Sequence, residues 1–218
     1  MHKSLVNLIE IRKEINSKSL DLNSKVKIIA VSKTFSIDNI LPLIDNGHLD
    51  FGENKVQEAV DKWTDIKNYK KDLKLHMIGK LQTNKVKQAV KLFDYIHSLD
   101  SLKLAKKISE EQKKTKKNIK IFIQINIGNE IQKSGIMIND LKNFYNTCVK
   151  DLNLDIIGLM CLPPANIDPS NSFQTMEKEA KNLFLKELSM GMSSDYISAI
   201  KFNASFIRIG SRIFGLRN

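Results

Sequence analysis

The residue with the clearest potential for chemistry in this sequence is a lysine at the end of a short apolar run. Lys33 follows residues 28–31, whose continuous apolar character is typical of a strand buried on both faces of a parallel sheet. The C-terminal end of such a strand faces the side of an α/β fold where ligands bind. Burial lowers the pKa of a lysine readily, and a neutral amine forms a Schiff base with an aldehyde. The alternative interpretation is that Lys33 marks the exit of the strand into solvent.

Small and hydroxyl-bearing residues follow two apolar segments near the C-terminus. Residues 190–195 (MGMSSD) include Ser193, and residues 209–212 (IGSR) include Gly210 and Ser211. We expect both segments to lie at helix N-termini, where backbone N–H groups bind phosphate. Two ordinary capped helix starts are the alternative interpretation. Together with Lys33, these segments suggest a cofactor that is a phosphorylated aldehyde.

Eight short strands alternate with helices along the chain. Strands are expected at residues 25–33, 49–54, 75–79, 95–99, 119–127, 155–162, 188–192 and 205–210. Helices are expected at residues 4–17, 36–44, 56–63, 86–93, 102–108, 141–149, 171–185 and 196–201. This alternation predicts one α/β domain over residues 1–218, a single (β/α)8 TIM barrel with its site at the C-terminal strand ends. A doubly wound open sheet is the alternative, but it would have fewer strands, and no glycine-rich dinucleotide fingerprint follows the first one.

Net charge suggests an anionic partner. The 218 residues carry 35 Lys and Arg against 24 Asp and Glu, a formal charge of +11. A nucleic-acid role is the less favoured alternative, because the densest basic run has no interleaved aromatic residues and precedes a strand at the end of a predicted helix. That run contains Lys113, Lys114, Lys116, Lys117 and Lys120.

Several classes of protein are disfavoured by composition. No apolar stretch has the length of a membrane span, and the N-terminus lacks the apolar centre of a signal peptide, so we expect a cytoplasmic protein. Cys148 and Cys161 are too few for a disulfide framework, and no Cys/His cluster suggests a metal site.

Eight segments distributed along the chain resemble one family in order. The longest are residues 30–34 (AVSKT), 51–58 (FGENKVQE), 76–85 (HMIGKLQTNK) and 208–215 (RIGSRIFG). Shorter ones lie at residues 123–126, 133–136, 158–160 and 188–193. On these segments the sequence resembles the pyridoxal phosphate homeostasis proteins, single barrels related to the N-terminal domain of alanine racemase and to fold type III pyridoxal phosphate (PLP) proteins.

The resemblance implies a cofactor and a set of site residues. Lys33 would hold PLP as an internal aldimine, and Ser193, Gly210 and Ser211 would hold its phosphate. Asn54 would lie near the ring. Arg208 would lie near the pyridine nitrogen, where it would weaken the cofactor as an electron sink, or would pair with the phosphate. The sequence departs from the family at Lys55, Met77 and Ser211, where Tyr, Phe and Thr are more frequent.

The resemblance favours a PLP carrier without a complete catalytic site over a PLP-dependent racemase or decarboxylase. In related racemases a second domain completes the site, whereas this sequence stops a few residues after the eighth strand. PLP and PLP-dependent apoenzymes are the expected partners, with no membrane or nucleic-acid partner, and the chain is expected to be a monomer or weak dimer. A weak racemase-type activity stays open. His76 is interpreted as a core histidine, and residues 158–160 as barrel packing.

Overall fold

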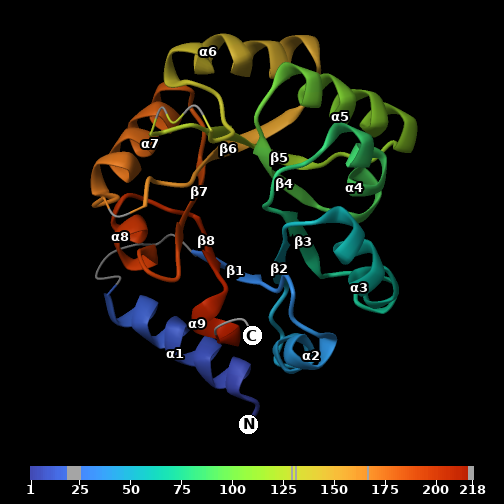
Figure 1. Cartoon of the computed structure of the whole chain (residues 1–218), viewed down its shortest axis with the longest axis vertical. Helices are drawn as coiled ribbons and strands as arrows, with labels where there is room; N and C mark the ends of the chain where they lie inside the picture. The colour runs from blue at the N-terminus through green and yellow to red at the C-terminus, as the bar shows by residue number, and fades with distance from the viewer. Residues whose placement is uncertain (19–25, 129, 131, 166, 216–218) are drawn as a thin grey trace.

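Eight parallel strands close into a barrel in which each strand pairs with the next and β8 pairs with β1. The computed structural model describes residues 1–18, 26–128, 130, 132–165 and 167–215. The predicted (β/α)8 architecture is confirmed (Figure 1). The strands are β1 (Lys27–Val31), β2 (Asp50–Glu53), β3 (Lys74–Met77), β4 (Tyr95–Leu99), β5 (Lys120–Ile125), β6 (Asp155–Cys161), β7 (Glu187–Met192) and β8 (Phe206–Ile209).

Helices surround the barrel and follow the strands in sequence (Figure 1). They are α1 (Lys3–Lys18), α2 (Ile37–Asp45), α3 (Val56–Tyr69), α4 (Val86–Leu92), α5 (Leu102–Thr115), α6 (Ile138–Asn146), α7 (Ser170–Asn182), α8 (Tyr196–Lys201) and α9 (Ser211–Phe214). Two further turns are the 3-10 helix η1 (Thr83–Lys85) and the π-helical η2 (Thr147–Asp151). None of the described helices is long and apolar enough to cross a membrane.

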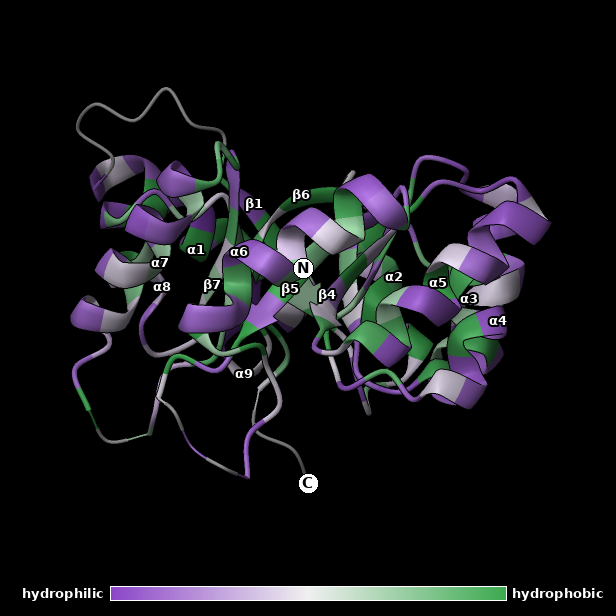
Figure 2. Ribbon diagram, turned by 90° about the horizontal axis from the view of Figure 1, so that it is seen from above, coloured by the Kyte–Doolittle hydropathy of each residue, from purple (hydrophilic) through white to green (hydrophobic). Residues whose placement is uncertain are grey.

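Two apolar clusters form the core. The larger lies between the outer faces of the strands and the helices. In Figure 2 the strands are largely apolar, and the helices carry both apolar and hydrophilic residues. The smaller cluster combines residues of five strands inside the barrel. Its members are Ile29, Tyr95, Phe122, Met160 and Phe206, all nearly or fully buried. Burial of Leu159 and Met160 agrees with the interpretation of residues 158–160 as packing.

Some predicted boundaries differ from the structure. The first strand was expected at residues 25–33, but β1 ends at Val31 and residue 25 lies outside the described residues. The helix expected over 171–185 ends at Asn182, because Phe184 adopts a left-handed backbone with φ 55°. The lysines after α5 also have structural roles, since Lys117 donates to the carbonyls of Lys91 and Phe93 at 3.0 and 2.8 Å.

The N-terminal helix α1 packs against the last helices of the chain. α1 lies beside α9 (Figure 1). Asn7 donates to the carbonyl of Ile213 at 2.8 Å. Arg212 pairs with Glu14 at 3.0 Å, and the Tyr196 hydroxyl donates to the same Glu14 carboxylate at 2.7 Å. These contacts connect the helix that begins at Ser211 to an element from the opposite end of the chain.

Candidate functional site

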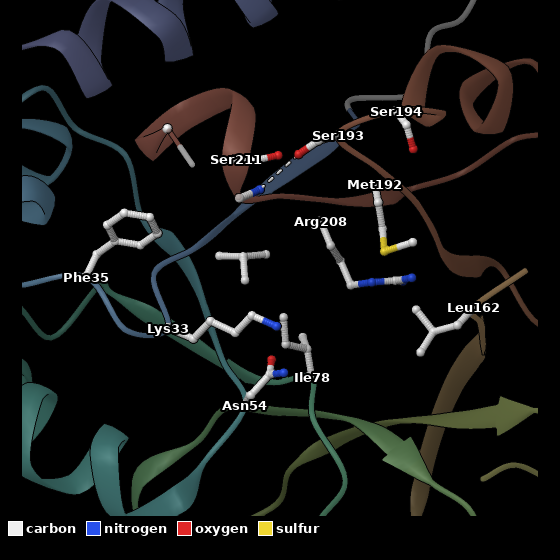
Figure 3. A pocket seen from close by; sticks show the side chains of 13 residues that line it. Lys33, Phe35, Asn54, Ile78, Leu162, Met192, Ser193, Ser194, Arg208 and Ser211 are labelled. Carbon is white, nitrogen blue, oxygen red and sulfur yellow. Dashed lines mark hydrogen bonds between the residues drawn. The ribbon is translucent and has the colours of Figure 1, made fainter. Parts of the chain in front are cut away.

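A cavity of about 800 Å³ opens at the C-terminal ends of the strands (Figure 3). This volume lies within the usual range of small-molecule sites. All six residues predicted for cofactor binding line this one cavity, although they come from the C-terminal ends of four different strands and the segments that follow them. They are Lys33, Asn54, Ser193, Arg208, Gly210 and Ser211. Apolar side chains, among them Val31, Ile78 and Leu162, form much of the remaining wall.

Lys33 lies in a tight turn two residues after β1. The Ser32 N–H donates to the Gly52 carbonyl at 3.0 Å, and the Phe35 N–H donates back to the Ser32 carbonyl at 3.2 Å. Thr34 occupies the left-handed region with φ 67°, which is unusual for a β-branched residue. Figure 3 shows that this turn directs the Lys33 side chain into the cavity, beside Asn54.

Two glutamates and a lysine brace the turn from behind. Glu53, fully buried at the end of β2, accepts from the Ser32 hydroxyl at 2.8 Å and from the Trp63 indole N–H at 2.9 Å. The Lys62 ammonium pairs with Glu53 at 3.1 Å and with Glu58 at 3.0 Å. Burial raises the pKa of Glu53, although these donors oppose the shift.

These bracing residues were not identified from the sequence as functional. Glu53 and Glu58 belong to the family-like segment 51–58, and Glu58 and Lys62 stand at the i,i+4 spacing of helical ion pairs. That spacing predicts the surface pair only. The contact of Lys62 with the Ser32 carbonyl, at 2.9 Å, depends on how α3 packs against the β1 turn.

A polar edge of the cavity is formed by the loops after β7 and β8. The Gly210 N–H donates to the Ser193 hydroxyl at 3.4 Å, and Ser211 is the first residue of α9 (Figure 3). The Asp195 side chain accepts from the Met192 N–H at 2.6 Å and makes no cap bond to α8, so it closes the loop that carries Ser193.

Arg208 is 4% exposed and rises from β8 into the cavity. Its guanidinium donates to the Ser189 hydroxyl at 2.7 Å and to the Cys161 carbonyl at 2.8 Å. Figure 3 shows the side chain extending toward Leu162, away from Ser193 and Ser211. Burial lowers the pKa of the guanidinium, but an arginine remains charged in proteins.

Other residues considered from the sequence have structural positions. His76 is fully buried and hydrogen-bonded to Asp50 and His97, as expected of a core histidine. Tyr196 lies four residues after β7, and its hydroxyl donates to the Glu14 carboxylate. Cys148 and Cys161 are buried and not disulfide-bonded, and burial raises the pKa of each thiol to about 12.

Comparison with known proteins identifies the family. The sequence profile of the alanine racemase N-terminal domain matches residues 6–218. A pyridoxal phosphate homeostasis protein of Haemophilus influenzae is 36% identical over 224 residues, which span 98% of this chain and 94% of the relative. A second one, from Synechocystis, is 36% identical over 205 residues and 94% of its length.

This chain belongs to the pyridoxal phosphate homeostasis protein family. The structure of PipY of Synechococcus elongatus with PLP bound is 32% identical, has a TM-score of 0.86, and is covered over 100% of its length by 97% of this chain. An alanine racemase of Clostridium difficile is 15% identical, has a TM-score of 0.72 and shows the fold alone. Our chain spans 57% of that racemase. The family resemblance and the barrel class predicted from the sequence are thus confirmed.

Proposed function

We propose that this chain binds pyridoxal 5'-phosphate in the Lys33 cavity and acts in PLP homeostasis as a carrier without turnover. The observation that carries the proposal is the placement of an amine and a hydroxyl-rich edge around one cavity. Lys33 enters from the β1 turn, while Ser193, Gly210 and Ser211 form the edge after β7 and β8. A primary amine fits an aldehyde, and hydroxyl and N–H donors fit a phosphate. The donor set therefore fits a phosphorylated aldehyde.

Each residue has a separate task in this proposal. When bound, the cofactor supplies an aldehyde carbon that condenses with a primary amine. Lys33 provides that amine, and the braced turn keeps it directed into the cavity. The hydroxyls of Ser193 and Ser211, with the Gly210 N–H, hold the phosphate. Asn54, which also lines the cavity, would contact the ring.

Arg208 takes the pyridine-nitrogen role rather than the phosphate role. Its guanidinium is bound to Ser189 and to the Cys161 carbonyl, and it extends away from Ser193 and Ser211. A guanidinium only donates hydrogen bonds, so it leaves a neighbouring ring nitrogen unprotonated. An unprotonated ring is a weak electron sink, which suits storage better than turnover.

The lining of the cavity supports a carrier over a racemase or decarboxylase. A racemase needs acid–base groups on both faces of the substrate carbon. Among the described residues that line the cavity, Lys33 and Arg208 are the ionisable ones. We further propose that the chain acts as a monomer or weak dimer in the cytoplasm, and that PLP-dependent apoenzymes accept its cofactor.

Titration with PLP, followed by visible absorption, tests the proposal. We expect a band in the wild type that borohydride removes, and no such band in Lys33→Ala. Racemisation of alanine by the loaded protein should not exceed that of the Lys33→Ala variant. The absence of a band in the folded wild type would overturn the binding proposal. Racemisation that depends on Lys33 would overturn the carrier assignment and favour the enzyme.

A further inference from the structure

A continuous line of side-chain hydrogen bonds crosses the inside of the barrel. It begins at Arg208 in the cavity, whose Nη1 lies 2.7 Å from the Ser189 hydroxyl. Ser189 Oγ lies 2.8 Å from His97 Nδ1, and His97 Nε2 lies 2.9 Å from His76 Nδ1. His76 Nε2 lies 3.0 Å from Asp50 Oδ1. Asp50 opens β2 at the opposite end of the barrel from the cavity, where its side chain is 21% exposed.

The two ends of this line fix the direction of its first and last bonds. The guanidinium can only donate, so Ser189 accepts from Arg208. Burial opposes ionisation of Asp50, but the hydrogen bond from His76 and the nearby Lys27 charge favour it, and the pKa of this carboxyl is lowered. The carboxylate can only accept, so His76 carries its proton on Nε2.

The middle of the line follows from the neutral state of both imidazoles. Burial lowers the pKa of His76 and, further, that of His97. Neutral His76 has a bare Nδ1, which accepts from the Nε2–H of His97. The bare Nδ1 of His97 then accepts from the Ser189 hydroxyl. Each of the four hydrogen bonds contains one proton. In every bond the donor is the residue nearer the cavity and the acceptor is the residue nearer Asp50.

Aromatic rings exclude water from the central part of the line. Tyr95 stacks on His76 and Phe122 stacks on His97, each with ring centroids 4.3 Å apart. Phe206 lies against both imidazoles, at 5.8 and 5.9 Å between centroids. Hydrogen bonds in such a low-dielectric interior are electrostatically stronger than in water and polarise one another.

The buried guanidinium charge of Arg208 requires stabilisation by polar groups. Its charge is buried, and within the described residues no carboxylate forms a salt bridge with it. Buried charges are otherwise costly, and oriented dipoles reduce that cost. The line aims one acceptor oxygen at Nη1 and has a carboxylate at its far end.

We propose that Ser189, His97, His76 and Asp50 form a directional relay that positions Arg208 as a donor to the cofactor ring. The relay deepens the proposed function and rests on it for the identity of the ligand. These four are positioning residues, because they act through Arg208. The relay makes the tautomers of two histidines part of the cofactor site, although neither histidine lines the cavity.

Nitrogen NMR of histidine-labelled protein without added cofactor tests the relay itself. The sequence has four histidines, and His2→Gln with His48→Gln leaves the two of the relay. We expect His76 and His97 to be neutral Nε2–H tautomers with bare Nδ1 atoms at pH 7. In Asp50→Ala, His76 should no longer be held in the Nε2–H tautomer. In Asp50→Asn, which keeps an acceptor oxygen, the Nε2–H tautomer of His76 should again predominate. A protonated Nδ1 on His97 in the wild type would overturn the relay.

The effect on the cofactor is tested with two buried serines. Ser189→Ala removes the acceptor of Arg208 and the donor of His97, and should weaken PLP binding about tenfold. Ser98→Ala is the matched control, since this hydroxyl, next to His97 in sequence, is buried on β4 and has no hydrogen-bond partner among the described residues. The control should bind within about twofold of the wild type. If wild type binds PLP and both variants bind equally well, the relay does not position Arg208. If the tautomers are as expected and wild type binds no PLP, the proposed function fails instead.

Discussion

The Glu58 carboxylate accepts a hydrogen bond from the backbone N–H of Thr34, the residue that directly follows Lys33. Thr34 has the left-handed φ of 67°, which costs free energy for a residue other than glycine. The same carboxylate pairs with Lys62, which also donates to the Ser32 carbonyl. The helix α3 thus holds both residues that flank Lys33.

Loss of the contacts from Glu58 and Lys62 to the β1 turn should make the position of the Lys33 side chain less well defined. Glu58→Gln keeps an acceptor for Thr34 but removes the charge that pairs with Lys62, so we expect PLP affinity to fall by about three- to tenfold. Glu110→Gln, which removes a carboxylate from an exposed pair with Lys107 on α5, is the control. Equal affinities of the two variants would show that the brace does not position Lys33.

The hydroxyls after β7 and β8 should distinguish ligands with and without phosphate. Ser193→Ala and Ser211→Ala should each weaken PLP binding by about ten- to a hundredfold, because hydrogen bonds to a charged group are worth about 1.5–3 kcal/mol. Binding of pyridoxal, which lacks the phosphate, should be unchanged. Competitive titration of both ligands measures this, and equal losses for both would remove the phosphate role.

Gly79, which packs against the cavity residue Asn54, and Gly210, which lines the cavity, should respond differently to alanine. A Cβ on Gly79 would lie 2.4 Å from the Asn54 carbonyl oxygen, so Gly79→Ala must displace the Asn54 backbone. A Cβ on Gly210 would meet Val31 at an ordinary 3.5 Å, and the backbone N–H would remain. Thermal unfolding and PLP titration should therefore show losses for Gly79→Ala and near-wild-type behaviour for Gly210→Ala. The reverse order would contradict the cavity geometry.

Acid should destabilise the fold through His48. Burial, reinforced by Arg12, lowers the pKa of His48 to about 4, below its ordinary 6.5. As the pH falls through this window the unfolded chain binds the proton first, so the free energy of unfolding decreases, by about 3 kcal/mol at pH 4. His76 and His97 act in the same direction, and Glu53, with its raised pKa, acts in the opposite one.

The difference between wild type and His48→Gln isolates this contribution. Urea unfolding at several pH values should show a smaller loss of stability between pH 6.5 and 4 for the variant. Parallel curves for the two proteins would show that His48 does not keep its neutral form in the folded state.

Sequence patterns were sufficient to predict the barrel and the location of the cavity at the C-terminal ends of its strands. Apolar runs end where polar residues enter the loops, so Lys33 and Asn54 could be placed at strand ends before the fold was known. The Arg208 contacts could not be predicted, because its partners Ser189 and Cys161 are 19 and 47 positions away in the sequence and meet it only inside the closed barrel. The same is true of Lys62, whose reach to the Ser32 carbonyl depends on helix packing.

The most direct test of the Lys33 cavity is to reduce the PLP-loaded protein with borohydride and map the modified peptide by mass spectrometry. One equivalent of PLP should leave a single pyridoxyl group, on Lys33. Lys80→Ala, which changes an exposed lysine outside the cavity lining, should give the same map. Modification spread over surface lysines, with Lys33 unmodified in the folded protein, would contradict the account.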